Sequence, residues 1–298
     1  MEKYIIVSAN FCQSVFEKGF LQDVRHNLWR ILRMKLMISA DIEGTCGICH
    51  WNETEKNHSD HEYFAKQMTK EVKAVCDGAL ETGNVDSVYI KDAHDSARNI
   101  IPEMLPEQIT IMREWPGGPC SMMAGLEDCD AIAMTGYHSA AGTDGNPLAH
   151  TSNLQNVSVW LNGEVASEFM INTYYAAYFG KPVIFLSGDK ALCESAKKIC
   201  PEIETVAVSE GKAGASISIH PNVAVKRMYA GIQKALQKDL KAYKVKLPDY
   251  FRAEVQFKEI AKAQRGSFYP GARKSGPRSV AFESADYYEV ARFFYFVL

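Results

Sequence analysis

The sequence predicts an α/β fold: a layered α/β domain with a largely parallel central sheet, plus a C-terminal α/β lobe. Short apolar runs typical of buried strands alternate with longer segments of helical periodicity. Glycine and proline separate many of these segments, and the pattern changes beyond about residue 210. Strands that alternate with helices favour parallel pairing, because each helix returns the chain to the start of the next strand.

In chain order, the apolar runs predict strands at 35–40, 87–92, 109–113, 131–135, 157–161, 182–187 and 204–208. Helices are expected at about 60–81, 121–128, 166–179 and 190–199. The third of these helices ends at Gly180, and Pro182 prevents its continuation. Asp189 is placed to cap the fourth helix. Asn162-Gly163 predicts a tight turn, and therefore one hairpin in the central sheet.

Beyond residue 210, the strand-like ASISI precedes a long predicted helix at 222–242. A strand at 251–257, a loop rich in Gly and Pro, a strand at 279–283 and a final helix from Ala285 follow. We expect these elements to form the C-terminal lobe. Residues 1–33 are interpreted as an N-terminal extension of unclear role, and residues 34–298 as the catalytic domain, with a possible sub-division near 210.

Composition argues against several kinds of partner. The net charge is −3 and charges of both signs are mixed along the chain, so neither a nucleic acid nor an anionic membrane is expected as a partner. No apolar run approaches the ~20 residues of a membrane span, and the apolar patch near the first residues is too short for a signal peptide. Eight scattered cysteines are interpreted as reduced thiols in a cytoplasmic protein.

Cys46-Gly-Ile-Cys49 forms a C-x-x-C motif just after the first predicted strand. Such a motif can be a redox pair or half of a zinc site. The zinc interpretation needs a second close pair, and Cys193 and Cys200 are too far apart in sequence. The redox interpretation needs a helix that begins at the first cysteine, and no helical pattern follows until about His58. We therefore favour two small residues in a loop.

Polar side chains follow the ends of three predicted strands. The first strand is followed by Asp41 and Glu43, the second ends at Asp92-Ala-His94, and a later strand is followed by His138. Ligands of open α/β sheets bind outside the carboxyl ends of the strands, and residues two apart on an extended segment point to the same side. Carboxylates and imidazoles together suit zinc, manganese or iron. Each residue has a plainer alternative: a lone histidine often lies in a loop, and Asp92 can cap a turn or orient His94.

These residues also match a family. Ser39-Ala-Asp-Ile-Glu-Gly44 resembles the S-x-D-x-E-G signature of the DppA-type D-aminopeptidases, which are zinc-dependent bacterial enzymes. Asp92-Ala-His94 is similar to that family's D-S-H, and Gly136-Tyr-His138 to its G-Y-H. His150, in LAHTS, lies where the family has a catalytic histidine, and Glu168 matches its G-E-L-G-L-N-A-Y segment. The resemblance runs from Met34 to Leu298.

The resemblance implies two zinc ions per chain, held by Asp41, Glu43, His94, His138 and Glu168, with Asp41 bridging and His150 catalytic. It further implies an aminopeptidase that hydrolyses short peptides with an N-terminal D-amino acid through a metal-activated hydroxide. A ring-shaped homo-oligomer is also implied, a decamer in that family, with the active site facing an internal channel. The sequence departs from the family at TCGICHW after Gly44, which can reshape the rim of the pocket.

Three alternatives to this function stay open. The same metal site can serve another amide hydrolase, for example one that acts on γ-glutamyl or L-configured substrates. A non-catalytic peptide-binding protein is the second alternative. The third is a thiol oxidoreductase that uses Cys46 and Cys49, which predicts activity without metal.

Overall fold

The computed structural model describes residues 34–298. The predicted N-terminal extension, residues 1–33, lies outside the described residues. Within residues 34–298 the strands form two sheets, one of seven strands and one of five. No helix in this described part of the chain is long and apolar enough to cross a bilayer.

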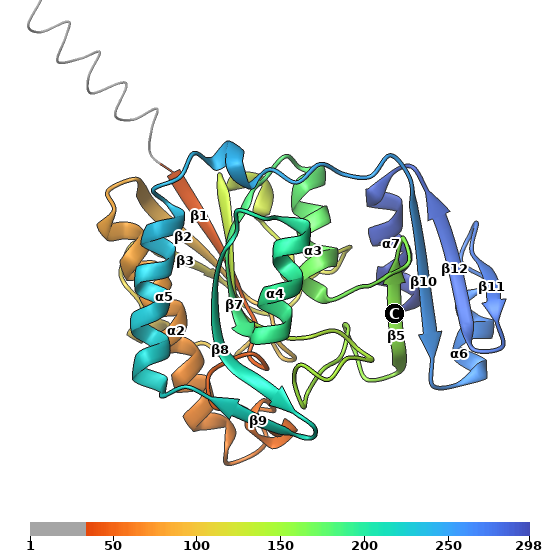
Figure 1. Ribbon diagram of the computed structural model, residues 1–298, viewed down its shortest axis with the longest axis horizontal. Helices are drawn as coiled ribbons and strands as arrows, with labels where there is room; N and C mark the ends of the chain where they lie inside the picture. Colours follow the sequence, from red (N-terminus) through yellow and green to blue (C-terminus); the bar gives the residue numbers. More distant parts are fainter. Residues whose placement is uncertain (1–33) are drawn as a thin grey trace, which may run out of the picture. The chain divides into compact units, whose positions relative to one another are not determined.

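The central sheet has the strand order β3-β2-β1-β4-β7-β8-β9 (Figure 1). The pairs β2–β3, β1–β4, β4–β7 and β7–β8 are parallel, and the β8–β9 pair is antiparallel. The predicted α/β class with a largely parallel central sheet is therefore confirmed. The strands are β1 (Met34–Ala40), β2 (Val85–Asp92), β3 (Ile109–Met112), β4 (Ala131–Tyr137), β7 (Val183–Asp189), β8 (Glu204–Lys212) and β9 (Ala215–Ser218).

The second sheet is antiparallel and has the order β11-β12-β10-β5-β6. Its strands are β5 (Asn156–Leu161), β6 (Glu164–Val165), β10 (Phe251–Phe257), β11 (Arg273–Gly276) and β12 (Ser279–Ser284). The prediction that the 157–161 strand and its hairpin belong to the central sheet is wrong, because β5 pairs with β10 instead. The turn itself is as predicted: Asn162 and Gly163 both have positive φ, at 53° and 84°, as a type I′ turn requires.

Helices cover both faces of the central sheet. Figure 1 shows α2 (His61–Glu81) and α5 (Pro221–Ala235) on one side, with α3 (Glu168–Tyr178) and α4 (Lys190–Ile199) on the other. Two further helices, α6 (Ile260–Gly266) and α7 (Tyr287–Val297), pack against the second sheet. Strands between two helical layers bury both faces, which explains why every residue of β4 and β7 is buried.

Helix ends follow local sequence signals. The Asp189 carboxylate accepts a hydrogen bond from Leu192 N at 2.9 Å, so the predicted cap of α4 is confirmed. Ser167 caps α3 in the same way through Met170 N at 3.2 Å. This cap sets the first residue of α3, Glu168, at the position where the helix dipole favours a carboxylate.

Three predicted boundaries are wrong. The helix expected at 121–128 is a pair of short 3-10 turns, η3 (Ser121–Met123) and η4 (Leu126–Asp128), because Gly125 between them is left-handed with φ 92°. The helix expected at 222–242 ends at Ala235 and is followed by the 3-10 turn η5 (Leu240–Tyr243). The loop expected at 266–279 contains β11, and α6 directly precedes it. Two further 3-10 turns are η1 (Trp51–Glu53) and η2 (Pro102–Met104).

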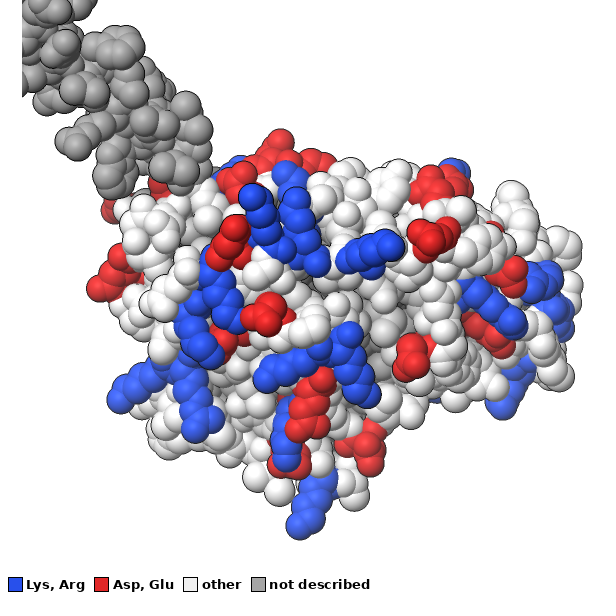
Figure 2. Space-filling view, turned by 45° about the horizontal axis from the view of Figure 1, so that its top comes forward, with Lys and Arg blue, Asp and Glu red and all other residues white. Residues whose placement is uncertain are grey.

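Charged side chains of both signs are interspersed over the face seen in Figure 2. Exposed ion pairs in the described part of the chain include Lys190 with Glu210 at 3.0 Å and Lys238 with Glu202 at 2.8 Å. Exposed pairs of this kind contribute only about 0–1 kcal/mol each. We therefore attribute the stability of the fold mainly to its buried apolar strands.

Candidate metal centre

The predicted site residues lie where the winding of the central sheet reverses. From β1 the chain proceeds outward through β2 to β3, and from the neighbouring β4 it proceeds the other way through β7 to β8. Such a switch point opens a crevice at the carboxyl ends of the strands. Asp41 follows β1, His94 follows β2 and His138 follows β4. The topology therefore brings three distant segments to one edge of the sheet.

Two glycines allow the loops after β1 and β4 to cross at this edge. Gly44 N donates to the carbonyl of Gly136 at 2.8 Å. A Cβ on Gly44 would lie 1.8 Å from the carbonyl oxygen of Tyr137, and one on Gly136 would lie 2.2 Å from that of Asp41. Because backbone atoms cannot yield, only glycine fits at either position. The crossing holds Asp41 and Glu43 beside His138.

The first half of the centre consists of Asp41, Glu43 and His94. The Nδ1 atom of His94 lies 3.4 Å from Asp41 Oδ1 and 3.0 Å from Glu43 Oε2. All three residues are buried, and their ligand atoms lie within 4.8 Å of one another. This is the spacing that a single metal ion bound by three protein side chains needs.

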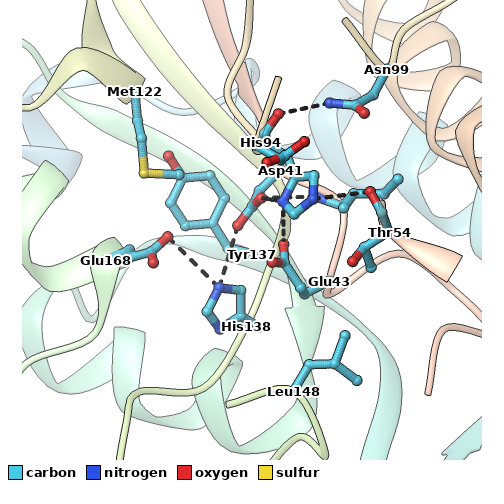
Figure 3. Close-up of polar contacts among 12 residues, drawn as sticks. Asp41, Glu43, Thr54, His94, Asn99, Met122, Tyr137, His138, Leu148 and Glu168 are labelled. Carbon is cyan, nitrogen blue, oxygen red and sulfur yellow. Dashed lines mark hydrogen bonds and ion pairs between the residues drawn. The ribbon is translucent and has the colours of Figure 1, made fainter. Parts of the chain in front are cut away.

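The second half consists of Asp41, His138 and Glu168. His138 Nε2 lies 3.5 Å from Asp41 Oδ2 and 3.7 Å from Glu168 Oε2. Figure 3 shows His94 and His138 on different sides of Asp41, each facing one of its carboxylate oxygens. Asp41 is therefore the residue shared by both halves, and Glu168 enters from the first turn of α3.

Backbone carbonyls determine which nitrogen of each imidazole faces the carboxylates. His94 Nε2 lies 3.1 Å from the carbonyl of Thr54, and His138 Nδ1 lies 2.9 Å from the carbonyl of Ser139. A carbonyl can only accept, so in each ring that nitrogen carries the proton. The opposite nitrogen, His94 Nδ1 or His138 Nε2, is then free to bind a cation.

Several polar atoms of the centre are buried without a hydrogen-bond partner in the described chain. They are Asp41 Oδ2, Glu43 Oε2 and His138 Nε2. Burying unpaired carboxylate and imidazole atoms is costly unless a cation compensates. Carboxylate oxygens and imidazole nitrogens are also the ligands that zinc takes in catalytic sites. The donor set and its unpaired atoms therefore fit a metal centre.

His150 lies beside the two halves. Its Nδ1–H donates to the carbonyl of Leu148 at 2.9 Å, and its Nε2 lies 3.7 Å from Glu43 Oε1 and 3.6 Å from Glu168 Oε1. The ring stacks on His138 with centroids 4.3 Å apart and planes inclined by 9°. His150 thus joins the other five predicted residues, and the structure brings all six together.

Burial and mutual charge shift the ionisation of the cluster. Burial, and then the charge of Glu43, raise the pKa of Asp41 well above its usual value. Burial also disfavours the charged form of Glu43, but His94, together with His150 and His138, outweighs burial and holds the pKa of Glu43 well below its usual value. His150 differs, because burial and then the charge of His138 lower its pKa. The cluster therefore contains two carboxylates whose pKa values are shifted in opposite directions, and one imidazole biased toward the neutral form.

Asp92 acts indirectly on His94. Its carboxylate accepts from Asn99 N at 2.6 Å and Ile100 N at 2.8 Å, and the Asn99 side-chain amide donates to the carbonyl of His94 at 2.8 Å. Asp92 therefore closes the loop that carries His94, as its predicted alternative role required. No motif indicates the role of Asn99, and a backbone carbonyl such as that of Thr54 has no signal in a sequence.

The two cysteines of the C-x-x-C motif do not form an activated pair. Cys46 is buried and its Sγ donates to the carbonyl of Ile219 at 3.0 Å. Burial, together with the charge of Glu71, raises the pKa of Cys46 to about 12. Burial and Glu53 raise the pKa of Cys49 as well. Protonated thiols are poor nucleophiles, which favours the predicted interpretation as loop residues.

A cavity of about 520 Å³ opens over the centre. Asp41, Glu43 and Glu168 lie on its floor, together with His94 and His150. Neither Lys nor Arg occurs among the described residues that line it, and aromatic and aliphatic side chains form much of its wall. Its volume lies within the range of pockets that bury small organic ligands.

Comparison with known proteins places this chain in a family. A sequence model of the family described as D-aminopeptidase, peptidase family M55, matches residues 34–296. The D-aminopeptidase of Bacillus subtilis (strain 168) is 27% identical over 260 residues, which cover 86% of this chain and 93% of that protein.

One solved structure has the same fold. It is described as Zn-dependent D-aminopeptidase DppA from Bacillus subtilis, a self-compartmentalizing protease, and it covers 89% of this chain and 96% of its own. The TM-score is 0.80 at 24% sequence identity, a likeness that shows the fold. The match over residues 34–296 confirms the resemblance found in the sequence motifs, and the chain belongs to the M55 family of D-aminopeptidases, which are hydrolases of peptide bonds.

Proposed function

We propose that this protein is a zinc-dependent aminopeptidase that removes N-terminal D-amino acids from short peptides and uses two metal ions per chain. The observation that supports two ions is the shared carboxylate: Asp41 belongs both to the group with Glu43 and His94 and to the group with His138 and Glu168. Two cations held close together need such a shared ligand. The related solved structure is described as Zn-dependent, which supports zinc as the metal.

Each side chain then has a defined task. Glu43 and His94 would hold one ion, His138 and Glu168 would hold the other, and Asp41 would be shared by both. Zinc, when bound, lowers the pKa of water toward 7 and polarises an amide carbonyl. The carbonyls of Thr54 and Ser139 keep each imidazole in the tautomer that can bind metal.

His150 is proposed to take the proton of the attacking water on its free Nε2 and then give it to the leaving amine. It is the most exposed side chain of the six, at 12%, and it lines the cavity where a peptide would lie. Its Nε2 faces the carboxylates on both sides of the centre. General acid catalysis needs a group of this kind within reach of the scissile amide.

We also propose a ring-shaped homo-oligomer. The support is that the related Bacillus subtilis protein is described as a self-compartmentalizing protease. Sedimentation velocity of the purified full chain tests this: a single large species agrees with a closed ring, and a monomer contradicts it.

The test of the proposed function is metal content measured beside activity. We expect about two zinc ions per chain, and we expect Asp41→Ala to lose both, because the bridge serves both halves. Asp41→Asn, which keeps the shape of the side chain, should also lose metal. Asp86→Ala removes an exposed carboxylate from β2 and should leave the zinc content unchanged.

The same preparations should cleave D-alanyl peptides faster than the matched L-alanyl peptides. Absence of any transition metal from protein purified without chelator would defeat the proposal. Faster cleavage of the L-peptides would keep the metal centre but reject the D-specific function.

A further inference from the structure

The wall of the cavity beside Glu168 is apolar and comes from three separate segments. Glu168, Ile171 and Asn172 lie at positions i, i+3 and i+4 of α3, so they share one face of that helix, and all three line the cavity. Met122 from η3 also lines it, and Figure 3 shows Met122 next to Tyr137 and Glu168. On the cavity face of α3, Ile171 lies one turn after Glu168, which is a proposed metal ligand.

Helix α7 supplies the rest of this wall. Tyr287 Oη donates to the carbonyl of Ile171 at 2.7 Å, which joins α7 to α3 at the level of the cavity. Ala291 and Phe294 follow Tyr287 by one and two turns on the same face of α7, and both line the cavity. They are nearly inaccessible to solvent, at 1% and 5% exposure. Helix α7 thus lies more than 100 residues from the loops after β1 and β2 that carry proposed ligands.

The wall is held in place by hydrogen bonds. Ser39 Oγ donates to the carbonyl of Met122 at 2.8 Å, and the side-chain amide of Asn172 donates to Met122 Sδ at 3.3 Å and to Tyr137 Oη at 3.2 Å. Through these two bonds Asn172 links Met122 to Tyr137 of β4. A pocket that is formed before binding costs little ordering entropy when a substrate enters.

We infer that Met122, Ile171, Ala291 and Phe294 form a subsite for an apolar side chain next to the scissile amide. The inference rests on the proposed function and names its substrate class: D-peptides in which one residue flanking the cleaved bond is of leucine or phenylalanine type. The transfer of an apolar side chain from water into this subsite is favourable. An acidic side chain would lose its hydration without finding a cationic partner, because neither Lys nor Arg occurs among the described residues that line the cavity.

The experiment compares two substrate series on the zinc-loaded full-length protein. The first series varies the N-terminal residue (D-Ala-Gly, D-Leu-Gly, D-Phe-Gly, D-Asp-Gly), and the second varies the residue after the bond (D-Ala-Gly, D-Ala-Leu, D-Ala-Asp). In one of the two series, the substrates with Leu or Phe at the varied position should have a kcat/KM about tenfold or more above that of D-Ala-Gly. The acidic residue should be the poorest substrate in that series.

Two variants test the wall itself. Ala291→Leu narrows the subsite and should shift the preference toward smaller side chains. Met122→Ala widens it and should shift the preference toward phenylalanine. Met122 lies in a short 3-10 turn and is only half-buried, so this variant decides the matter if Ala291→Leu does not fold. Phe296→Ala removes an aromatic ring of α7 that is 67% exposed and does not line this cavity, so it should leave the preference unchanged.

The outcomes separate this inference from the proposed function. Cleavage of D-Ala-Gly with no apolar preference in either series would overturn the subsite and leave the proposed function intact. Preferences that neither Ala291→Leu nor Met122→Ala shifts would also overturn it. Failure to cleave any D-peptide would defeat both.

Discussion

Among the clustered side chains, His150 is the one whose role depends most on its surroundings. Its Nδ1–H is held by the carbonyl of Leu148, so Nε2 faces Glu43 and Glu168. Nε2 also lies near enough to Glu43 and His138 to form a third group of metal-ligating geometry. The same position therefore suits a proton donor and a metal ligand, and the two roles predict different consequences of removing the ring.

We expect His150→Ala to keep its zinc and its fold while kcat falls by about 10²–10⁴-fold, the usual contribution of a general acid. Peptide binding should change much less, because the amide carbonyl would still meet the metals. Zinc content and kcat must be measured on the same preparation. Loss of zinc would make His150 a ligand, and full activity would make it a bystander.

His58→Ala is the matched control for this variant. His58 is exposed, pairs with Glu55 at 3.2 Å, and neither lines the cavity nor belongs to the clustered ligands. A comparable loss of kcat in both variants would mean that the effect is not specific to the centre.

Glu71 is a second residue with an unusual ionisation, and it affects stability. It lies buried on α2, where its Oε1 accepts from Cys46 N at 3.1 Å and from the Gln67 side chain at 2.9 Å. Burial raises the pKa of Glu71 to about 7. Its Oε2 has no hydrogen-bond partner in the described chain.

The folded protein therefore keeps this proton between the ordinary pKa of 4.5 and about pH 7, whereas the unfolded chain releases it. Unfolding then releases a proton, so the free energy of unfolding falls as the pH rises through this window. The accumulated penalty above pH 7 is on the order of 3 kcal/mol. Below pH 4.5 it is absent.

Glu71→Gln should remove this penalty, since a neutral amide replaces the carboxylate. We expect the variant to gain stability relative to the natural protein as the pH rises from 5 to 8. Urea unfolding of both proteins at pH 5, 6, 7 and 8, with the same zinc concentration, measures this difference. A difference that does not change with pH would contradict the raised pKa.

At the scale of elements, the crossing of the loops after β1 and β4 decides the geometry of the centre. We expect Gly44→Ala to destabilise the fold by at least about 2 kcal/mol, because the new methyl group would overlap the carbonyl of Tyr137. It should also lower the zinc content, since the same loop carries Asp41 and Glu43. Urea unfolding and elemental analysis of the variant test both effects.

Gly214→Ala serves as its control. A Cβ on Gly214 meets no atom within 4 Å, so this variant should change stability by no more than about 0.5 kcal/mol. Equal stability of the two variants would show that the loops can move apart, and the crossing would then not determine the site.

At the scale of the whole molecule, the family match spans residues 34–296 and all six clustered residues lie between 41 and 168. We therefore predict that removing residues 1–33 leaves folding, assembly and catalysis nearly unchanged. Thermal unfolding, sedimentation velocity and kcat of the truncated and full-length chains provide the comparison. A fall in Tm of more than about 4 °C, which corresponds to 1 kcal/mol or more for a chain of this size, would contradict this independence.

Much of the fold and of the centre was predictable because it depends on local patterns. The periodicity of strands and helices is visible over about ten residues. Asp189 caps the helix that follows it, and Asn162-Gly163 form a tight turn, so both signals are local. The approach of Asp41, His94 and His138 also follows from sequence, because parallel strands of one sheet end at a common edge. The family motifs and their order along the sequence predicted that the chain is a D-aminopeptidase, and the family match confirms this prediction.

Other features were decided only by the tertiary structure. The strand β5 pairs with β10, about 90 residues later, and no local pattern distinguishes that pairing from a place in the central sheet. The helix expected at 121–128 is interrupted at Gly125, because a left-handed glycine at this position permits two short turns instead. The carbonyls that orient His94 and His138 belong to the backbone, which is the same in every residue. Helix α7 reaches the cavity through packing on α3. Periodicity encodes which face of an element is buried, but the partner that covers it depends on contacts between segments far apart in the chain.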